Sequence, residues 1–515
     1  MDILLAASPI ALILILMIGF RWPGGRAGVA GWLAALLVAG LRFGAGPRLL
    51  WWAQVRGLFQ AVFVLYIIWG ALIFFRVTEA TGTLQEMSAA LKQISPGRAL
   101  QALLLAYGFS AFLQSIGGFG VPVAVVAPIL ISVGFPAVEA VVMPSLGDAW
   151  AVSFGSMGSS FFALTAATGL EGHVLAPWMA AMLAVVCIQT GFAVLWIAGG
   201  RAALRKALAP MLAMALVMAS VQWLAAWAGL WSIAAMLGSL AGLAVGIAWA
   251  VTQKRDRPLS ADLSPAALLP TMAPYAILLV IIFAENFIPP LHDFLGAIAL
   301  QVDVPQVATA QGWITPAGPT RDIALFGHPG ALLIYAGIAT LGMAHARGKL
   351  APGSGKQIAR GVLRSGVKST VGILTMVGMA ATMDHAGMIT QLSHAMADMA
   401  GGLFPLMAPL IGAMGAFVTG SNTNSNVLFG AFQLQVAEAL GYSVPVILAA
   451  HNASAAISSV VAPAKIIVGC STVGLAGREG DVLRRAARYI LAIIASIGGL
   501  ALLITLVESY ALVAR

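Results

Sequence analysis

Residues 419–429 read Thr-Gly-Ser-Asn-Thr-Asn-Ser-Asn-Val-Leu-Phe, so six polar residues in succession interrupt an otherwise apolar stretch. A similar interruption, Gln114-Ser-Ile-Gly-Gly-Phe-Gly-Val-Pro122, breaks an earlier apolar run. Both lie in segments that match at one constant offset of 305 residues (79 to 384, 170 to 475). The matching pairs are Glu79 and Asp384, Gly82 and Gly387, Ala111 and Ala416, Phe112 and Phe417, Ala151 and Ala456, Ser153 and Ser458, Gly169 and Gly474, and Leu170 and Leu475. The chain therefore contains an internal duplication, interrupted at the same place in each copy.

The composition places the chain in a membrane. Of its 515 residues, 60% are hydrophobic and 9% are charged, whereas soluble domains carry about 25% charged residues. Apolar runs of about 18 to 25 residues recur, and each can cross a hydrocarbon layer about 30 Å thick. We therefore predict an all-α polytopic membrane protein with about 12 to 14 transmembrane segments. A duplicated, interrupted helix in such a protein indicates a transport site.

The duplication divides the chain into four parts, and each repeat is predicted to contain a re-entrant hairpin followed by a broken helix. The parts are N-terminal helices over 1–57, a first repeat over 58–200 (hairpin about 114–135, broken helix 137–165), linking helices over 201–361, and a second repeat over 362–515 (hairpin about 419–440, broken helix 444–470). The opening helix has Asp2 and no basic residue before its apolar core, so we expect it to be retained rather than cleaved.

The charge pattern leaves the relation between the repeats open. The net charge of +9 is interpreted as the basic bias of cytoplasmic loops rather than as affinity for an acidic partner. Two basic segments, 345–368 and 478–488, fall on opposite sides of the membrane when the predicted spans are counted. Charge alone therefore cannot separate parallel from inverted repeats.

The two interruptions are predicted to be hairpin tips buried at membrane depth. Gly117, Gly118 and Gly120 permit positive φ and Pro122 lacks a donor, so helical geometry ends there. Unsatisfied backbone groups cost several kcal/mol each in lipid, so such a break survives only inside protein or beside a watery cavity. The alternative is a polar loop outside the membrane, but both stretches lack Lys and Arg. A helix N-terminus at a tip suits an anion, because its dipole contributes about half a positive charge.

A second polar interruption follows each hairpin. In the first copy, Gly147-Asp-Ala-Trp150 is followed by Gly155-Ser-Met-Gly-Ser-Ser160. In the second copy, His451-Asn-Ala-Ser454 is followed by Ser458-Ser459 and Pro463-Ala-Lys465. Asp148 and Asn452 correspond to within one residue of the offset. We expect two tips and two broken helices to converge at the midplane, around a cavity lined by hydroxyls, amides and free helix ends.

Three ionisable residues are predicted to lie deepest in the membrane: Asp148, His451 and Lys465. A charge at the bilayer centre costs about 2.5–3.5 kcal/mol on insertion scales, so such residues mark function. In the functional interpretation, Asp148 or His451 carries a proton and Lys465 attracts a substrate carboxylate. The structural alternative is an ion pair between Asp148 and Lys465 that orients the two repeats.

Two short amphipathic stretches, 78–98 and 384–398, are interpreted as interfacial connectors. Glu79 and Asp384 lie near their starts. A role for these two acids in substrate binding is the weaker alternative.

Four stretches carry a family pattern: Ser115-Ile-Gly-Gly-Phe-Gly-Val-Pro122, Phe154-Gly-Ser-Met-Gly158, residues 419–429, and Val473-Gly-Leu-Ala-Gly-Arg-Glu-Gly-Asp481. Together they resemble the lactate permease family over roughly 60–500. The resemblance implies a bacterial inner-membrane symporter that takes up L-lactate, and often glycolate or D-lactate, with protons. Ser-Asn-Thr at 421–423 is also similar to the hairpin-tip motif of a wider superfamily that includes dicarboxylate–sodium symporters. That similarity implies re-entrant hairpins, inverted repeats and elevator-type movement.

The chain resembles a divergent member of this family. Lactate permeases generally have an acidic residue where Gln114 stands and an Asp where Asn422 stands, and they usually have Asn near the position of Asp148. The ionisable groups are thus redistributed along the chain.

We predict secondary active uptake of a small monocarboxylate (L-lactate, D-lactate or glycolate) by proton symport. The alternative is sodium-coupled symport of another small organic anion. An anion of charge −1 that moves with one proton carries no net charge, which avoids about 2.3 kcal/mol per charge per 100 mV. The predicted substrate-binding residues are Gln114, Gly117, Gly118, Gly120, Ser421, Asn422, Thr423, Asn424, Asn452 and Lys465, and the predicted proton-coupling residues are Asp148 and His451.

Other function classes lack sequence support. The chain has no His-Glu-x-x-His, nucleophile elbow or Walker loop, so we predict neither an enzyme nor a metal or organic cofactor. Two isolated cysteines, Cys187 and Cys470, predict neither a metal site nor a redox pair. Duplicated broken helices suit a closed, alternating site better than the continuous pore of a channel. The expected partners are a small organic anion and the lipid bilayer, with no nucleic acid, and a homodimer is left open.

Overall fold

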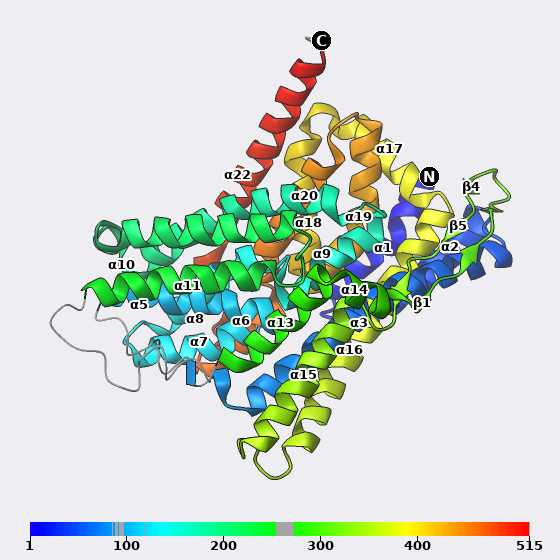
Figure 1. Cartoon of the computed structure of the whole chain (residues 1–515). Coiled ribbons are helices and arrows are strands. Elements are labelled where there is room, and N and C mark those ends of the chain that lie inside the picture. The colour runs from blue at the N-terminus through cyan, green and yellow to red at the C-terminus, as the bar shows by residue number, and fades with distance from the viewer. Residues whose placement is uncertain (85, 88–90, 92–96, 119, 254–271, 514–515) are drawn as a thin grey trace.

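The protein is described by a computed structural model, except for residues 85, 88–90, 92–96, 119, 254–271 and 514–515. Figure 1 shows that it is built almost entirely of helices. Its first half contains α1 (Asp2–Ile18), α2 (Gly24–Arg42), α3 (Pro47–Ala80), α5 (Arg98–Ala102), the π-helix η1 (Leu103–Phe109), α6 (Ser110–Ile116), α7 (Val121–Ser132), α8 (Ala137–Gly147), the 3₁₀-helix η2 (Ala149–Ala151), α9 (Gly155–Thr168), α10 (Gly172–Trp227) and α11 (Ala234–Gln253).

The second half begins with two short helices and six short strands, and ends in helices alone. It contains α13 (Ala273–Phe287), α14 (Pro289–Gly296), β1 (Ala299–Leu300), β2 (Asp303–Val304), β3 (Val307–Ala308), β4 (Ile314–Thr315), β5 (Gly318–Pro319), β6 (Ile323–Ala324), α15 (Pro329–Ala346), α16 (Ser354–His385), α17 (Met388–Ala400), the 3₁₀-helix η5 (Gly401–Leu403), α18 (Phe404–Thr419), α19 (Asn422–Ala439), α20 (Val444–Ser459), α21 (Pro463–Thr472) and α22 (Glu479–Val513). The stretch predicted to be amphipathic over 384–398 contains most of α17, whereas much of the one over 78–98 lies outside the described residues.

The chain is a multi-pass membrane protein. In its described part, ten helices are long and apolar enough to cross a membrane, or eleven if α13 and α14, bent by 91°, form one span. This number is lower than the predicted 12 to 14 for two reasons. The 56-residue α10 counts once, although its backbone leaves helical geometry at Gly199 and Gly200. The 17-residue α1 and the broken segment α8–α9 contain no helix of 18 residues.

The helices of the two repeats correspond one to one. α3 matches α16, the segment α5–η1–α6 matches α18, α7 matches α19, and the broken pair α8–α9 matches α20–α21. The ends of α3 and α16, Ala80 and His385, are separated by the same offset as the sequence duplication (385 − 80 = 305). The sequence duplication is therefore a duplication of structure.

The corresponding helices α3 and α16 pack against each other and run antiparallel. Gln54 Nε2 donates a hydrogen bond of 2.8 Å to Thr382 Oγ1. Further along α3, Trp69 Nε1 donates one of 3.0 Å to Thr370 Oγ1. Residue numbers thus rise along α3 as they fall along α16, which is the relation between equivalent helices in inverted-topology repeats. The two repeats are inverted.

Both predicted hairpins fold back on themselves. Arg98, at the start of α5, donates a hydrogen bond of 2.7 Å to the carbonyl of Gly134, which closely follows α7. In the second repeat, Gln433 of α19 donates one of 3.1 Å to the carbonyl of Ala408 in α18. Each pair of arms therefore enters and leaves at one end of the molecule, as a re-entrant hairpin does.

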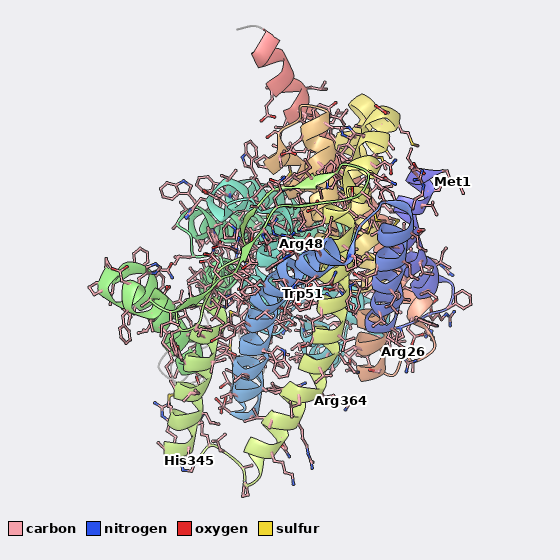
Figure 2. All side chains as sticks on the ribbon, turned by 90° about the vertical axis from the view of Figure 1, so that its right-hand side faces the viewer. Met1, Arg26, Arg48, Trp51, His345 and Arg364 are labelled. Atoms are coloured by element: carbon pink, nitrogen blue, oxygen red, sulfur yellow. The ribbon has the colours of Figure 1, made fainter. Side chains whose placement is uncertain are left out.

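The two basic segments lie on one side of the molecule, so the conflict between the charge pattern and the predicted spans comes from a miscounted span. Lys349, between α15 and α16, forms an ion pair of 3.4 Å with Glu86, which follows α3. Arg485 of α22 lies 3.7 Å from Glu139 at the start of α8. The predicted spans include the first arm of each hairpin as a full crossing. The second arm brings the chain back to the same side, so a hairpin contributes no crossing. In Figure 2, His345 at the end of α15 lies near the bottom of the molecule, and Arg364 of α16 lies above it.

The strands form a β-extension that the sequence did not predict. β1 pairs with β6, β2 with β5 and β3 with β4, all antiparallel, so residues 299–324 make one long hairpin-like ladder. It lies beside the N-terminal half of α3, where Arg56 donates a hydrogen bond of 3.3 Å to the Gly318 carbonyl. Figure 1 places it at the opposite end of α16 from the α15–α16 loop. Rungs of two residues give no run long enough for strand periodicity to appear in the sequence.

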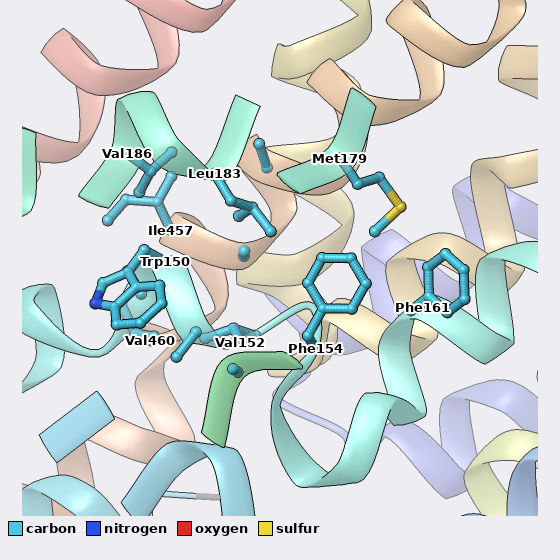
Figure 3. Packing of buried hydrophobic residues seen from close by; sticks show 14 of the residues in the cluster. Trp150, Val152, Phe154, Phe161, Met179, Leu183, Val186, Ile457 and Val460 are labelled. Atoms are coloured by element: carbon cyan, nitrogen blue, oxygen red, sulfur yellow. The ribbon is translucent and has the colours of Figure 1, made fainter. Parts of the chain in front are cut away.

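Large apolar side chains hold the first broken helix in place. Trp150, Phe154 and Phe161 are fully buried. Figure 3 shows them packed below Met179 and Leu183 of α10, with Ile457 of α20 and Val460, which directly follows α20, nearby. Because the interior is close-packed, the break is held between a helix of its own repeat and a helix of the other.

The positive-inside rule predicts that the face carrying the α15–α16 loop is cytoplasmic. Cysteines placed at Ala351, in that loop, and Ala317, in the β-extension, should both be exposed, while the native Cys187 and Cys470 are buried. In intact cells, a membrane-impermeant maleimide should label Ala317→Cys only. In inside-out vesicles, it should label Ala351→Cys only. Labelling of both cysteines from the same side would contradict this topology.

Candidate functional site

The first hairpin tip is a sharp glycine turn packed against both broken helices. α6 ends at Ile116 and α7 begins at Val121, and Gly118 and Gly120 have positive φ of 54° and 87°. A methyl group at Gly118 would meet Oγ of Ser156 in the first break, and one at Gly120 would lie 3.8 Å from Cγ of Lys465 in α21. Glycine is therefore needed at Gly118 for both conformation and space. Phe119 lies outside the described residues.

The second hairpin tip is a helix start rather than a loop. α18 ends at Thr419, Gly420 has a φ of 73°, and α19 begins at Asn422. The hydroxyl of Ser421 caps α19 by accepting a hydrogen bond of 3.3 Å from the Asn424 N–H. Most of the polar run therefore forms the first turn of a buried helix, where side-chain caps are favoured.

The two broken helices differ in where they break. In the first, α8 ends at Gly147 and α9 starts at Gly155, and Ser156 and Met157 have positive φ of 46° and 55°. Positive φ outside glycine is strained and is concentrated at functional sites. In the second, the break lies at 460–462, between α20 and α21. The earlier polar residues, 451–454, interrupt the apolar pattern but lie within the continuous helix α20.

A chain of buried hydrogen bonds links the second tip, the first break and α20. Asn422 Nδ2 donates to Ser153 Oγ at 3.3 Å, and Ser153 Oγ donates in turn to Asn452 Oδ1. One turn further along α19, Asn426 Nδ2 donates to the Ser160 carbonyl at 2.8 Å. The hydroxyls of Thr423 and Ser160 are 3.0 Å apart. The network thus joins side chains of both repeats.

Several buried polar atoms of the first break, α19 and α20 have hydrogen-bonding capacity to spare. Within the described structure, no partner is found for Asn422 Oδ1, Asn452 Nδ2, Asn426 Oδ1, Ser454 Oγ, Asp148 Oδ1 or either ring nitrogen of His451. A buried polar group without a partner costs about 1–3 kcal/mol, so native proteins rarely keep several together without a functional reason. The cluster is therefore suited to binding a small polar guest.

The predicted charged residues lie on the broken helices of the two repeats. Asp148 is 3% exposed and His451 is fully buried, with its ring against α18 at Gly412. Lys465 donates a hydrogen bond of 3.3 Å to Ser459 Oγ. Among the ion pairs of the described residues, which extend to 4.0 Å, none joins Asp148 to Lys465. The two charges interact at longer range, and both roles of these residues stay predictions.

A cavity of about 510 Å³ opens beside the second tip. Ser421, Thr423 and Asn424 line one side of it, and Arg26 of α2 and Lys368 of α16 contribute positive charge on the other. The deeper predicted residues, which are Gln114, Asp148, His451 and Asn452, are not among its lining residues. We call this space the tip cavity. It would attract an anion toward the second tip.

Sequence reasoning missed Ser153 and Ser160 as members of the site. Both are buried and bond to the polar run of the second repeat. The available clue was Ser153, which matches Ser458 at the repeat offset and could therefore have been singled out. Asn426 was recognised as part of the polar run but not as a site residue. Their contacts across the repeats could not be derived from spacing along the chain.

A multi-pass membrane protein whose inverted repeats bring two hairpin tips and two helix breaks to one buried polar site has the architecture of a membrane transporter. The sequence profile of the L-lactate permease family matches residues 2–507. The chain therefore belongs to the L-lactate permease family.

Known relatives are similar to this chain at low identity over nearly their full lengths. The L-lactate permease of Streptococcus iniae is 26% identical over 449 residues, which cover 85% of this chain and 91% of the relative. The glycolate permease GlcA of Escherichia coli (strain K12) is 24% identical over 547 residues, which cover 98% and 95%. Among solved structures, the YdaH transporter of Alcanivorax borkumensis matches with a TM-score of 0.47 and 12% identity over 85% of this chain and 84% of that one.

Proposed function

We propose that the protein takes up a small monocarboxylate, which is L-lactate, D-lactate or glycolate, by proton symport across a bacterial inner membrane. The observation that carries this proposal is the buried cluster of unpartnered amide and hydroxyl groups where the hairpin tips and helix breaks of both repeats meet. The names of the relatives, L-lactate permease and glycolate permease, support this substrate class.

The first turn of α19 is the proposed carboxylate-binding element. Its N-terminus presents free N–H groups and the positive end of the helix dipole. Asn452 Nδ2 can donate to a carboxylate oxygen, and Asn422 Oδ1 can accept a hydrogen bond from a 2-hydroxyl group. Lys465 lies at the first tip and adds a positive charge. Gln114 and the glycines of that tip complete the proposed pocket.

Asp148 is the proposed proton carrier, with His451 as a second candidate. Asp148 is buried at the first break, and its Oδ1 has no partner in the described structure. A carboxylate in this position is favoured in its neutral form unless a cation approaches. If the substrate anion and the proton move together, the moving unit is neutral and bypasses the electrical cost of about 2.3 kcal/mol per charge per 100 mV.

The proposed movement is of the elevator type. The hairpins and broken helices would slide as one unit against α3 and α16, which pack together along their length. Sodium-coupled transport remains the alternative. Uptake measured with and without sodium at fixed pH separates the two couplings.

Asp148→Asn should abolish accumulation of lactate driven by a pH gradient, because the amide cannot carry a proton. Counterflow exchange of lactate, which needs no net proton movement, should persist. The measurement is uptake of radiolabelled L-lactate into proteoliposomes under both conditions. Asp398→Asn, at an exposed position of α17, is the matched control and should behave as wild type. Full accumulation by Asp148→Asn would remove this residue from the mechanism.

Asn422→Ala should raise the KM for lactate about fivefold, since the hydrogen bond that Asn422 Oδ1 would accept from the substrate 2-hydroxyl contributes about 0.5–1.5 kcal/mol. The initial rate of counterflow at graded lactate concentrations gives this KM. Asn286→Ala, at an exposed position of α13, serves as the control. A KM unchanged by Asn422→Ala would show that the second tip lies outside the binding pocket.

A further inference from the structure

A second cavity, of about 230 Å³, lies between α3, α9, α16 and α19. Its polar lining includes Arg56, Gln60, Asp384 and His385. None of these residues belongs to the site described above. We call this space the arginine cavity.

The two cavities lie end to end along the same three helices. On α19, Thr423 and Asn424 line the tip cavity, whereas Val427 lines the arginine cavity about one helical turn further along. On α16, the lining of the tip cavity ends at Ile373, and the lining of the arginine cavity begins at Val377. On α3, Ile68 lines the tip cavity and Val64, one turn away, lines the arginine cavity. One turn of each helix therefore separates two hollows in a single interface.

The arginine cavity faces the side opposite the basic loops. Arg56 lies in the N-terminal half of α3 and Asp384 at the C-terminal end of α16, whereas Lys368 borders the tip cavity. Figure 1 shows the β-extension at this end of α3 and α16. The β-extension contacts the lining residues, because Arg56 donates to the Gly318 carbonyl and Thr315 Oγ1 donates to the His385 carbonyl at 3.4 Å.

The guanidinium of Arg56 retains free donor capacity. Its Nη2 bonds to a backbone carbonyl, and its Nε is buried without a partner in the described structure. Asp384 lines the same cavity, yet no ion pair within 4.0 Å joins it to Arg56 among the described residues. Asp384 instead accepts a hydrogen bond of 3.2 Å from Gln435. Asp384 interacts with the charge of Arg56 at longer range, and the free Nε–H of Arg56 is a donor available to another anion.

His385 supplies a complementary group in the same cavity. Its Nδ1 lies 2.9 Å from the Ala381 carbonyl, which can only accept, so Nδ1 donates. Its Nε2 is buried and unpartnered in the part of the chain that the structure describes. The neutral ring therefore offers an acceptor for a substrate hydroxyl or a proton. Arg56, Asp384 and His385 are the titratable and charged groups that line the cavity.

We propose that the arginine cavity is a second binding station for the small monocarboxylate, on the side opposite the tip cavity. This inference rests on the proposed function for the identity of the ligand. Arg56 binds the carboxylate through its guanidinium, and Gln60 and His385 contact the hydroxyl. Asp384 repels the anion and weakens its binding, so that the substrate can leave this station again. The path between the two stations runs along α19, past Thr423 and Val427.

The test is substrate protection of a cysteine in the cavity. Ala167 lines the cavity and is half-buried, so Ala167→Cys should react with the neutral reagent N-ethylmaleimide. Saturating L-lactate should slow this reaction severalfold in the purified full-length protein. Arg56→Gln should abolish the protection, and Arg56→Lys should retain part of it. Ala351→Cys, in the exposed α15–α16 loop, should react at the same rate with and without lactate.

Three controls separate binding at this station from indirect effects on the cysteine. Asn422→Ala should leave the protection in place, which excludes an effect relayed from the second tip. Arg48→Gln, at an exposed position of the same helix, should also leave it in place. The reaction rate without lactate should be equal with Arg56 and with Arg56→Gln, which shows that the cavity still forms.

Two results would overturn the proposal. One is an absence of protection by lactate in otherwise wild-type protein, and the other is protection that survives Arg56→Gln. Failure of the proposed function gives a different pattern, in which proteoliposomes accumulate no lactate. If Arg56-dependent protection persists without transport, the cavity is still a carboxylate-binding station and only the transport proposal fails.

Discussion

The structure depends on one constraint, which is that backbone leaving helical geometry inside a membrane must be satisfied by protein or water. This chain leaves it at two hairpin tips and two helix breaks. Each tip packs against a break: Gly118 against Ser156, Gly120 against Lys465, and Gly420 against Ala462. The irregular segments therefore cover one another, and their polar side chains are brought to the same place.

Inversion of the repeats explains why one buried site results rather than two. Because α3 and α16 are antiparallel, the tips enter from opposite directions, and each packs against a broken helix in the interior. Ser153 of the first repeat then stands between Asn422 and Asn452 of the second. The helices α3 and α16 remain outside this cluster and form a wall along which α19 lies. Both cavities occur along that wall, which links the polar site to both ends of the molecule.

Local sequence patterns predicted the main features of the fold. The offset of 305 residues determined the correspondence of helices, and the glycines before Pro122 and the polar run at 421–426 marked the tips. Long-range relations were less accessible. The sequence did not show whether the second repeat breaks at 451–454 or at 460–462. Polar residues at 451–454 are compatible with a continuous helix, because α20 is buried in protein there. The strands of the β-extension are two residues long, which is too short for an alternating pattern to appear in the sequence.

The candidate site was predicted in part. The predicted Asn422, Thr423 and Asn452 lie in one hydrogen-bonded network, whereas no ion pair within 4.0 Å joins Asp148 to Lys465 among the described residues. Arg56 was not singled out, because its neighbours come from other helices and a single Arg near a helix start carries no local signal. Asp384 was interpreted as an interfacial residue, yet it lines the arginine cavity. Side chains that meet through inversion have no fixed spacing in the sequence.

The central claim is that both repeats jointly form one substrate site, with Ser153 and Asn422 side by side inside it. The most direct measurement is the rate of disulfide formation between cysteines introduced at these two positions, in membranes treated with a mild oxidant. The account predicts rapid cross-linking that L-lactate slows. A folded protein in which the two cysteines do not cross-link, or cross-link at a rate independent of lactate, would contradict it.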